Sequence, residues 1–306
     1  MGRVTARRRV TRLTVGTPAI RREDLLAAEE PLEIRVGGRS LAVTMRTPGN
    51  DLDLATGFLV SEGIIRRGDQ LASARFCAGE YGSTENTYNV LDVTLAPGVV
   101  APDPALARAF YTTSSCGLCG KASIDAVHTK SAYEVRNDPL VVDAQLLTTL
   151  PNALRAAQDV FDKTGGLHAA GLFDGHTGEL LVLREDVGRH NAVDKVVGWA
   201  AKEGLLPLRS TVLMVSGRAS FELVQKAVMA GIPMLAAVSA PSSLAAELAT
   251  DSGMTLVGFL RGESMVIYAG AERIAPEVEE GSRQRATIEK GTRIKDDARI
   301  TEGSAA

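Results

Sequence analysis

The sequence predicts an α/β protein, with α+β character where its N-terminal part carries strands of its own. Residues 211–215 and 233–238 are apolar without alternation, which is typical of strands buried on both faces of a sheet. Predicted helices separate these strands, and the order from residue 167 to residue 268 is ββαβαβαββ. We therefore expect a mixed sheet with flanking helices, together with a smaller N-terminal β-containing subdomain.

The N-terminal part alternates apolar and polar residues, the pattern of half-buried strands. Residues 32–36 and 41–45 alternate on either side of a two-glycine turn, which predicts a β-hairpin. A helix is expected next, from Asn50 or Asp51 as N-cap to about Ile65. Its expected buried stripe consists of Leu52, Ala55, Phe58 and Leu59. Further elements expected in this half are a strand at 88–95 and a helix at 121–128.

The second half begins with a helix that we expect Asp143 to cap and that extends to Phe161. Pro151 lies inside this segment and is expected to kink or divide it. The elements after it are predicted strands at 167–173, 179–184, 211–215, 233–238, 254–260 and 264–268, and predicted helices at 191–202, 221–230 and 243–250.

These patterns divide the chain into four regions. The first is a basic, solvated tail at 1–13, and the second is a β-rich portion at 14–140 that contains a Cys-X-X-Cys loop. The third is the α/β domain at 141–270. The last, 271–306, is rich in charged and small residues, so we expect a disordered tail.

Composition excludes several functional classes. The net charge of −3 argues against a general nucleic-acid binder, and aromatic residues at 4% argue against stacking on single strands. We expect no membrane segment, because no apolar run approaches the roughly 18 residues that span a bilayer. The basic N-terminus lacks the apolar core of a secretory signal, and three cysteines predict a reducing compartment. The expected location is the cytoplasm.

The most reactive stretch of the sequence contains Cys116 and Cys119. Two thiols at this spacing can form a redox pair, hold half of a structural zinc site or present one reactive sulfur. Glycines at 117 and 120 leave the sulfurs uncrowded, and the N-terminus of a following helix would favour the thiolate. Cys77 has no second cysteine nearby and is interpreted as a packed thiol.

Three polar loops follow predicted strands and are expected at one edge of the sheet. They are 184–191, 216–220 and 259–264. Gly217 lets backbone approach a ligand, and Arg218 is a bidentate donor to anions. In the first loop, Asp186, Arg189, His190 and Asn191 are candidates to bind a base or ribose and a phosphate. The loops together predict a nucleotide-like anion pocket, although neither the P-loop nor the Rossmann glycine pattern is present.

Catalytic zinc is disfavoured by the residues around the candidate ligands. A zinc deaminase needs a glutamate beside its histidine ligand and a proline before its Cys-X-X-Cys. His168 is followed by two alanines, and Ser115 precedes Cys116. A non-catalytic zinc site that uses both cysteines with His168 and His190 stays open. Thioredoxin-like chemistry is weaker, because the cysteines follow a proline-broken loop and not a strand.

Several motifs in order along the chain resemble those of the formate dehydrogenase accessory sulfurtransferases. The resemblance extends from about residue 14 to residue 270 and is carried by residues 46–50, 57–63, 113–120, 185–195 and 216–222. It implies a fold similar to that of cytidine deaminases, in a protein that is dimeric.

The resemblance also implies a function. A cysteine desulfurase would load sulfur onto Cys116 as a persulfide, with Cys119 supporting the transfer. The acceptor would be the molybdenum cofactor, bis-molybdopterin guanine dinucleotide, before that cofactor enters formate dehydrogenase. No permanently bound cofactor and no metal are expected. The cofactor-binding residues that the resemblance or the loop argument indicates are Gly217, Arg218, Phe259, Leu260, Arg261, Gly262, Glu263 and Ser264.

Two other functions remain as alternatives. The first is a non-catalytic, cofactor-binding chaperone in which the cysteine pair is structural. The second is a zinc-dependent hydrolase or deaminase, which stoichiometric zinc would support.

Overall fold

A six-stranded mixed sheet forms the centre of the second half of the chain. The structure is a computed structural model that describes residues 4–77, 88–102 and 131–275. The strand order is β13-β12-β11-β10-β8-β9, with β10, β11 and β12 parallel and β8, β9 and β13 antiparallel to their neighbours. The strands are β8 (His168–Asp174), β9 (Leu180–Asp186), β10 (Thr211–Val215), β11 (Met234–Ala237), β12 (Thr255–Arg261) and β13 (Ser264–Ala269). The predicted mixed α/β fold is confirmed.

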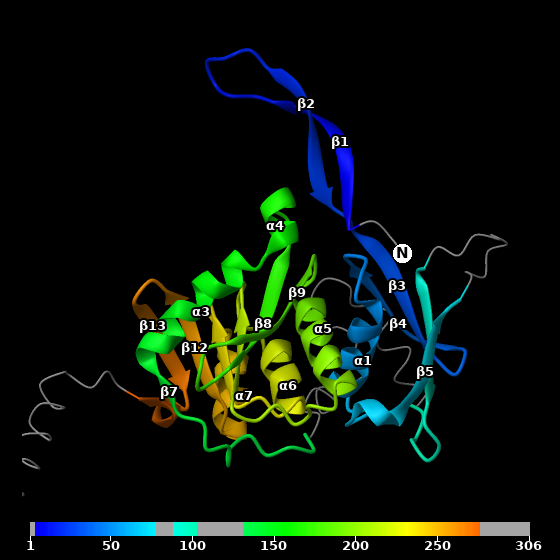
Figure 1. Cartoon of the computed structure of the whole chain (residues 1–306), viewed down its shortest axis with the longest axis vertical. Helices are drawn as coiled ribbons and strands as arrows, with labels where there is room; N and C mark the ends of the chain where they lie inside the picture. The colour runs from blue at the N-terminus through cyan, green and yellow to red at the C-terminus, as the bar shows by residue number, and fades with distance from the viewer. Residues whose placement is uncertain (1–3, 78–87, 103–130, 276–306) are drawn as a thin grey trace, which may run out of the picture.

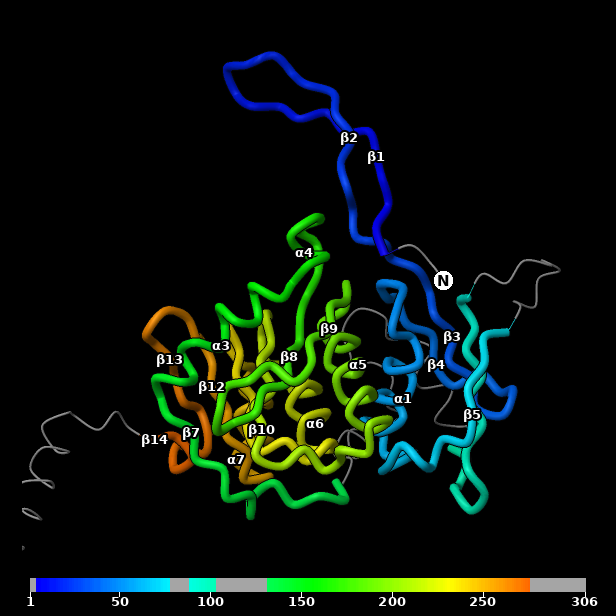
Figure 2. Tube along the Cα trace, viewed as in Figure 1, coloured from blue at the N-terminus to red at the C-terminus, as the bar shows by residue number. Residues whose placement is uncertain are grey.

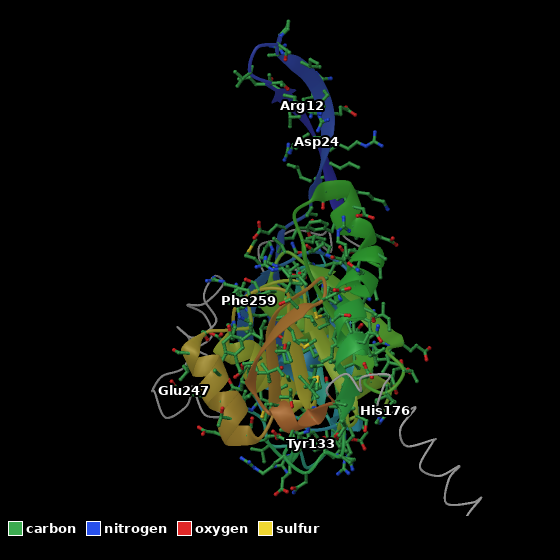
Figure 3. The ribbon with its side chains drawn as sticks, turned by 90° about the vertical axis from the view of Figure 1, so that its left-hand side faces the viewer. Arg12, Asp24, Tyr133, His176, Glu247 and Phe259 are labelled. Atoms are coloured by element: carbon green, nitrogen blue, oxygen red, sulfur yellow. The ribbon has the colours of Figure 1, made fainter. Side chains whose placement is uncertain are left out.

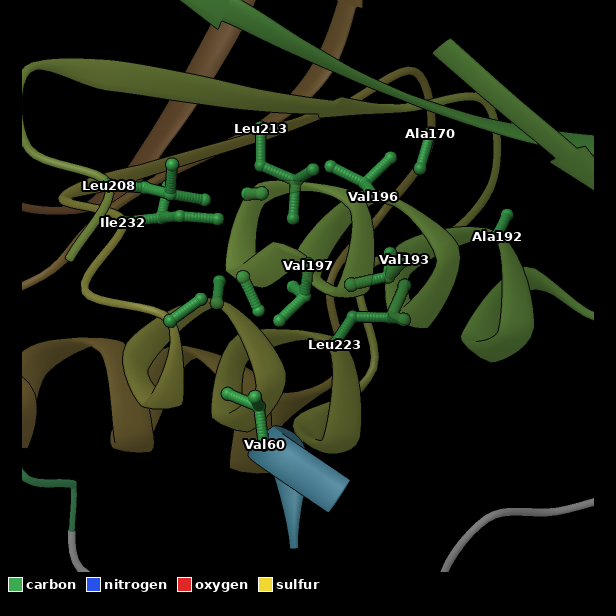
Figure 4. Packing of buried hydrophobic residues seen from close by; sticks show 14 of the residues in the cluster. Val60, Ala170, Ala192, Val193, Val196, Val197, Leu208, Leu213, Leu223 and Ile232 are labelled. Atoms are coloured by element: carbon green, nitrogen blue, oxygen red, sulfur yellow. The ribbon is translucent and has the colours of Figure 1, made fainter. Parts of the chain in front are cut away.

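Helices cover both faces of this sheet (Figure 1). On one face lies α3 (Ala144–Ala156), and on the other lie α5 (Arg189–Lys202), α6 (Phe221–Met229) and α7 (Ser243–Ser252). Strand residues alternate between the two cores: Leu213 packs toward α5, and Met214 packs toward α3. Figure 4 shows Val193, Val196 and Val197 of α5 packed among the residues of the first core.

The helix before β8 ends differently from the prediction. Asp143 caps α3 as predicted, with its carboxylate accepting from Gln145 N at 2.7 Å. The helix continues through Pro151 to Ala156, so Pro151 does not divide it. Leu147, Leu150 and Leu154 on its inner face are all buried, and this packing holds the helix across the proline. A second short helix, α4 (Asp159–Thr164), follows.

In the described residues of the N-terminal half, a four-stranded sheet and a helix pack against the second half. The sheet has the order β4-β3-β6-β5, from β3 (Glu30–Val36), β4 (Arg39–Arg46), β5 (Leu71–Phe76) and β6 (Val90–Leu95). The predicted hairpin is confirmed: Gly37 and Gly38 both have positive φ, as the tight turn between β3 and β4 requires. Between this sheet and α5 lies α1 (Asp51–Ser61), shown in Figure 1, and the short 3₁₀ helix η1 (Gly68–Gln70) precedes β5.

Helix α1 is shorter and more deeply buried than the sequence pattern suggests. It ends at Ser61, before Gly63 with φ of 73°, and not near Ile65. Its buried apolar residues are Leu54, Ala55, Leu59 and Val60, whereas Leu52 and Phe58 of the predicted stripe are only half-buried. The cause is that α1 packs against α5 on one side and the N-terminal sheet on another, so a single amphipathic stripe does not describe it.

The two halves share one hydrophobic core. Leu32 and Leu91 of the N-terminal sheet belong to the same cluster of buried residues as Val196 and Leu213 of the second half. Val135 also packs into this cluster, so residues on both sides of the predicted 140/141 boundary serve the same core. The chain's two halves are therefore layers of one packed unit.

Both predicted tails need correction. Residues 5–12 form β1 (Thr5–Arg12), which pairs with β2 (Ile20–Ala27) in a protruding antiparallel hairpin, visible as the uppermost trace in Figure 2. At the other end, η3 (Ala271–Arg273) and β14 (Ile274–Ala275) lie within the first residues of the predicted tail, and β14 pairs with β7 (Val142–Asp143). Arg273 anchors it, with 4% exposure and a 2.8 Å hydrogen bond to the Gly253 carbonyl.

No helix in the described ranges is long and apolar enough to cross a bilayer. The predicted helix at 121–128 and the part of the C-terminal tail beyond residue 275 lie outside the described residues.

Candidate functional site

The loops predicted to form a site do gather at one edge of the six-stranded sheet. Strands β9 and β10 are both antiparallel to β8, so they run in the same direction, and β11 and β12 are parallel to β10. The carboxyl ends of four strands therefore meet at one edge. Backbone hydrogen bonds join successive loops: Ser242 N donates to Ala219 O at 3.0 Å, and Phe259 N donates to Ser239 O at 3.2 Å.

The loop after β10 brings its backbone against a histidine. Gly217 lies so close to His168 that an added Cβ would stand 3.4 Å from Nδ1 of the ring. Arg218 is exposed and makes no ion pair with any residue that the structure describes. Both predicted residues thus lie at the edge of the sheet. Gly217 is packed against His168, whereas Arg218 is accessible to an anion in solution.

In the 259–264 loop, four residues are exposed, Phe259 is half-buried and Leu260 is buried. Arg261, Gly262, Glu263 and Ser264 are all exposed, and the Arg261 guanidinium lies 5.7 Å from the centre of the Phe259 ring. Leu260, by contrast, is 0% exposed and packs into the core on the α3 side. The strand register shifts between Gly258 and Arg261, and the Leu260 side chain is held in the core, so Leu260 could meet a ligand only through its backbone.

Two residues of the 184–191 loop are occupied by structural contacts and do not face a ligand. Asp186 is 0% exposed and accepts from Lys195 Nζ at 2.7 Å and from Thr47 N at 3.1 Å. Asn191 donates to Met45 O at 2.7 Å and to Asp186 Oδ1 at 3.0 Å. The expectation that Asp186 and Asn191 bind a base or ribose is therefore wrong. They fasten the end of β4 to the start of α5.

Arg189 and His190 of the same loop also lie at this edge, and His190 is held by neighbouring side chains. Nε of Arg189 is buried and has no hydrogen-bond partner among the described residues. Nε2 of His190 lies 3.2 Å from Ser220 Oγ and 3.6 Å from Glu222 Oε2. Both contacts use the same ring nitrogen, which differs from a Ser-His-acid triad in which the acid binds the other nitrogen.

The charge states at this edge follow from burial and neighbours. Burial lowers the pKa of His168 below its usual range, and the nearby Arg189 and His190 lower it further. Asp186 raises this pKa, but the net direction is down, so the His168 imidazole is neutral near pH 7. Burial alone would raise the pKa of Glu222, but hydrogen bonds from His190, the backbone and Ser220 lower it to about 2. The site therefore presents a neutral imidazole in its interior and a carboxylate that is already paired.

A pocket of about 580 Å³ opens beside His168 on the α3 face of the edge. Its walls include Leu154 and Phe161, and Ser216 and Gln158 supply polar groups. Gln158 is 3% exposed, and its side-chain amide has no hydrogen bond to any described residue. The pocket combines apolar walls with the neutral polar groups of Gln158, Ser216 and His168 and with the Arg155 guanidinium, a set that suits a flat heterocycle.

Sequence patterns did not indicate Gln158, because the break between α3 and α4 lies at residues 157–158, whereas the predicted kink or division was at Pro151. The guanidinium of Arg155, one turn earlier, stacks 4.7 Å from the centre of the Phe161 ring and bridges the same break. The sequence feature that could have indicated Gln158 as a site residue is a polar side chain between two helical segments.

Cys116 and Cys119 lie outside the described residues, so a zinc site that joins them to His168 and His190 stays an untested alternative. Within the described parts of the chain, no group of three or more histidine, cysteine, aspartate or glutamate side chains is placed to hold a metal. Cys77 is described as a free, half-buried thiol.

Comparison with known proteins agrees with the family suggested by the sequence motifs. The family model of the FdhD/NarQ family matches residues 27–275. A protein of Streptomyces avermitilis named sulfur carrier protein FdhD is 63% identical over 276 residues, which cover 90% of this chain and 97% of that protein. One of the same name from Mycobacterium tuberculosis is 56% identical over 277 residues, 90% of this chain and all of that protein.

The fold also resembles a solved structure. The crystal structure of a putative formate dehydrogenase accessory protein from Desulfotalea psychrophila matches with a TM-score of 0.69 at 22% identity. The match covers 89% of this chain and 100% of the other. It confirms the arrangement of elements across nearly the whole chain.

Proposed function

The chain belongs to the FdhD/NarQ family, and from this premise we propose that it is a sulfur carrier. It accepts sulfur from a cysteine desulfurase as a persulfide on Cys116 and passes it to bis-molybdopterin guanine dinucleotide, the molybdenum cofactor of formate dehydrogenase. The observation that carries the proposal is 63% identity, over 90% of the chain, to a protein named sulfur carrier protein FdhD. A homodimer and a cytoplasmic location belong to the same proposal.

The loading step is a thiol exchange between two proteins. The Cys116 thiolate attacks the terminal sulfur of the donor's persulfide, a new S–S bond forms, and the donor cysteine leaves as a thiolate. Release of that sulfur as sulfide requires two electrons. Cys119 supplies them by attacking the inner sulfur of Cys116, which forms a Cys116–Cys119 disulfide. The spacing of the two cysteines suits this step, and a cellular dithiol would reduce the disulfide for the next cycle.

The sheet edge provides the chemistry that the acceptor cofactor needs. Its pyrophosphates are anions, and Arg189, Arg218 and Arg261 all belong to loops at this edge. Its pterin and guanine rings are flat heterocycles with donor and acceptor edges, which match the amide of Gln158 and the neutral ring of His168 beside apolar walls. We therefore assign the pocket and the three loops to the cofactor.

Intact-mass spectrometry after incubation with a cysteine desulfurase and cysteine tests the sulfur-carrying step. We expect the wild type to gain the mass of one sulfur atom and Cys116→Ala to gain none. Cys77→Ala is the matched control, since this thiol lies outside the motif and should leave the label unchanged. Cys119→Ala should keep the label but fail to release it.

The result that contradicts the proposal is active formate dehydrogenase matured by Cys116→Ala. If the wild type binds guanosine diphosphate but never acquires sulfur, the chain is a cofactor-binding chaperone. If the double variant Arg218→Ala/Arg261→Ala still binds guanosine diphosphate as the wild type does, these two loops do not bind the cofactor.

A further inference from the structure

The β1–β2 hairpin, residues 5–27, is an arm that stands clear of the rest of the protein. Two perpendicular views show it projecting from the body, with Arg12 and Asp24 far from the other labelled residues in the second view (Figures 1 and 3). All eight residue pairs from Thr5↔Ala27 to Arg12↔Ile20 are in register, yet none of its strand residues is buried. A two-stranded hairpin with both faces in water is marginally stable, so a surface that covered this one would stabilise it.

The arm has a composition typical of a protein interface. Residues 4–28 contain six arginines, two carboxylates, no lysine and no aromatic residue, in a chain of net charge −3. Protein interfaces favour arginine over lysine. Membrane-binding segments use aromatic anchors, which are absent here. Within the described structure, Arg8, Arg9, Arg12 and Arg21 make no ion pair, so their charge is available to a partner.

The two faces of the arm differ. Residues directly opposite each other share a face, so Arg8, Arg12 and Arg22 lie together with Val10, Ile20 and Leu26. Asp24 lies on the same face, with its carboxylate 3.2 Å from the Arg22 guanidinium. Ile20 is 62% exposed and Leu26 is 43% exposed. The other face carries Arg7, Arg9 and Arg21 with Glu23 and Leu25, and Arg7 lies 3.8 Å from Glu23. Each face thus carries three arginines and one carboxylate, and the faces differ in that the first also exposes the apolar side chains of Ile20 and Leu26.

The base of the arm lies at the rim of the pocket. β2 packs against α4, and the Cβ of Ala27 lies 3.9 Å from where a Cβ on Gly166 would stand. Gly166 and its neighbour Gly165 line the pocket. A protein held by the arm would thus be positioned above the pocket. The family model begins at residue 27, the last residue of the arm.

From these observations we propose that the arm is a docking site for the recipient protein, which takes up the cofactor bound in the pocket. The partner surface is acidic with an aliphatic recess, and it lies beside the opening through which that protein takes up its cofactor. A second copy of this chain is a weaker candidate, because it would cover the edge from which the cargo must leave. The identity of the recipient as formate dehydrogenase rests on the proposed function.

Binding of the full-length chain to the cofactor-free formate dehydrogenase catalytic subunit from the same genome tests the arm. Arg8→Glu/Arg12→Glu/Arg22→Glu reverses the charged, aliphatic face, and Arg7→Glu/Arg9→Glu/Arg21→Glu makes the same charge change on the other face. We expect the first variant to weaken binding by about tenfold or more and the second by about threefold or less. Equal thermal unfolding midpoints would show that both variants keep the folded body.

The proposal would be overturned if the first variant bound the catalytic subunit with wild-type affinity. It would also be overturned if both variants lost the same fraction of that affinity. Three other results would also overturn it if the first variant still bound the catalytic subunit normally. These are loss of dimerisation, loss of binding to anionic vesicles and loss of binding to DNA in that variant. Persulfide loading is measured separately in each variant and should equal that of the wild type. Absence of loading in the wild type would therefore refute the sulfur-carrier function, whereas normal loading with arm-independent binding would refute only the arm.

Discussion

Asp194 joins three helices through a buried ion pair. Its carboxylate oxygens lie 2.8 Å from the Lys226 ammonium, and Ser61 Oγ donates to it at 2.8 Å. The side chain of Lys226 is only 10% exposed. Asp194→Ala would leave that ammonium buried without a counter-charge, so we expect the free energy of unfolding to fall by about 3–5 kcal/mol in urea titrations.

The matched control is Asp69→Ala, which breaks an ion pair in water. Arg67 and Asp69 lie 2.8 Å apart with side chains 67% and 65% exposed, so the expected loss is below about 1 kcal/mol. A double variant, Asp194→Leu/Lys226→Met, should recover part of the stability lost in Asp194→Ala. Similar losses for Asp194→Ala and Asp69→Ala would contradict the argument from burial.

At the scale of elements, the packing of α1 on α5 depends on two glycines. A Cβ placed on Gly57 would lie 1.8 Å from Asp194 O, and one on Gly198 would lie 1.8 Å from Asp53 O. The backbones of the two helices are therefore in contact at the crossing. The contact places Asp53 near Arg184 and Lys202, to which it is joined at 2.9 Å and 2.7 Å.

Gly57→Ala should force α1 and α5 apart. Because the clash is with backbone atoms that no rotamer change can move, we expect a loss of about 3 kcal/mol or more in unfolding free energy. Gly166→Ala is the control, since a Cβ there meets nothing closer than 3.9 Å. Urea denaturation compares the two variants, and a stable Gly57→Ala protein would show that the crossing can widen without cost.

At the scale of the whole molecule, the shared core predicts that the two layers unfold together. Trp199, the chain's one tryptophan, lies in α5 between them and reports on tertiary packing. We expect its fluorescence and far-UV circular dichroism to give coincident urea transitions. Two separated transitions would instead favour independent domains on either side of residue 140.

Local patterns in the sequence determined most of the elements. The alternation in β3 and β4, the Gly37-Gly38 turn and the Asp143 cap each depend on neighbours within a few residues, so sequence alone predicts them. The continuous apolar segments predicted β10 and β11 for the same reason, and strand direction then placed the polar loops at one edge. The family motifs indicated which chemistry to expect there.

Only the tertiary structure decided which polar residues are free to act. Asp186 and Asn191 stood in a charged loop, but contacts with Thr47 and Met45, far away in sequence, occupy them. Leu260 is core, and Gln158 faces the pocket. Hydrogen bonding and burial depend on residues that are distant along the chain, whereas propensity and periodicity are local. The same reason explains why residues 5–12, basic enough to suggest a solvated tail, form one strand of the arm once Ile20–Ala27 pairs with them.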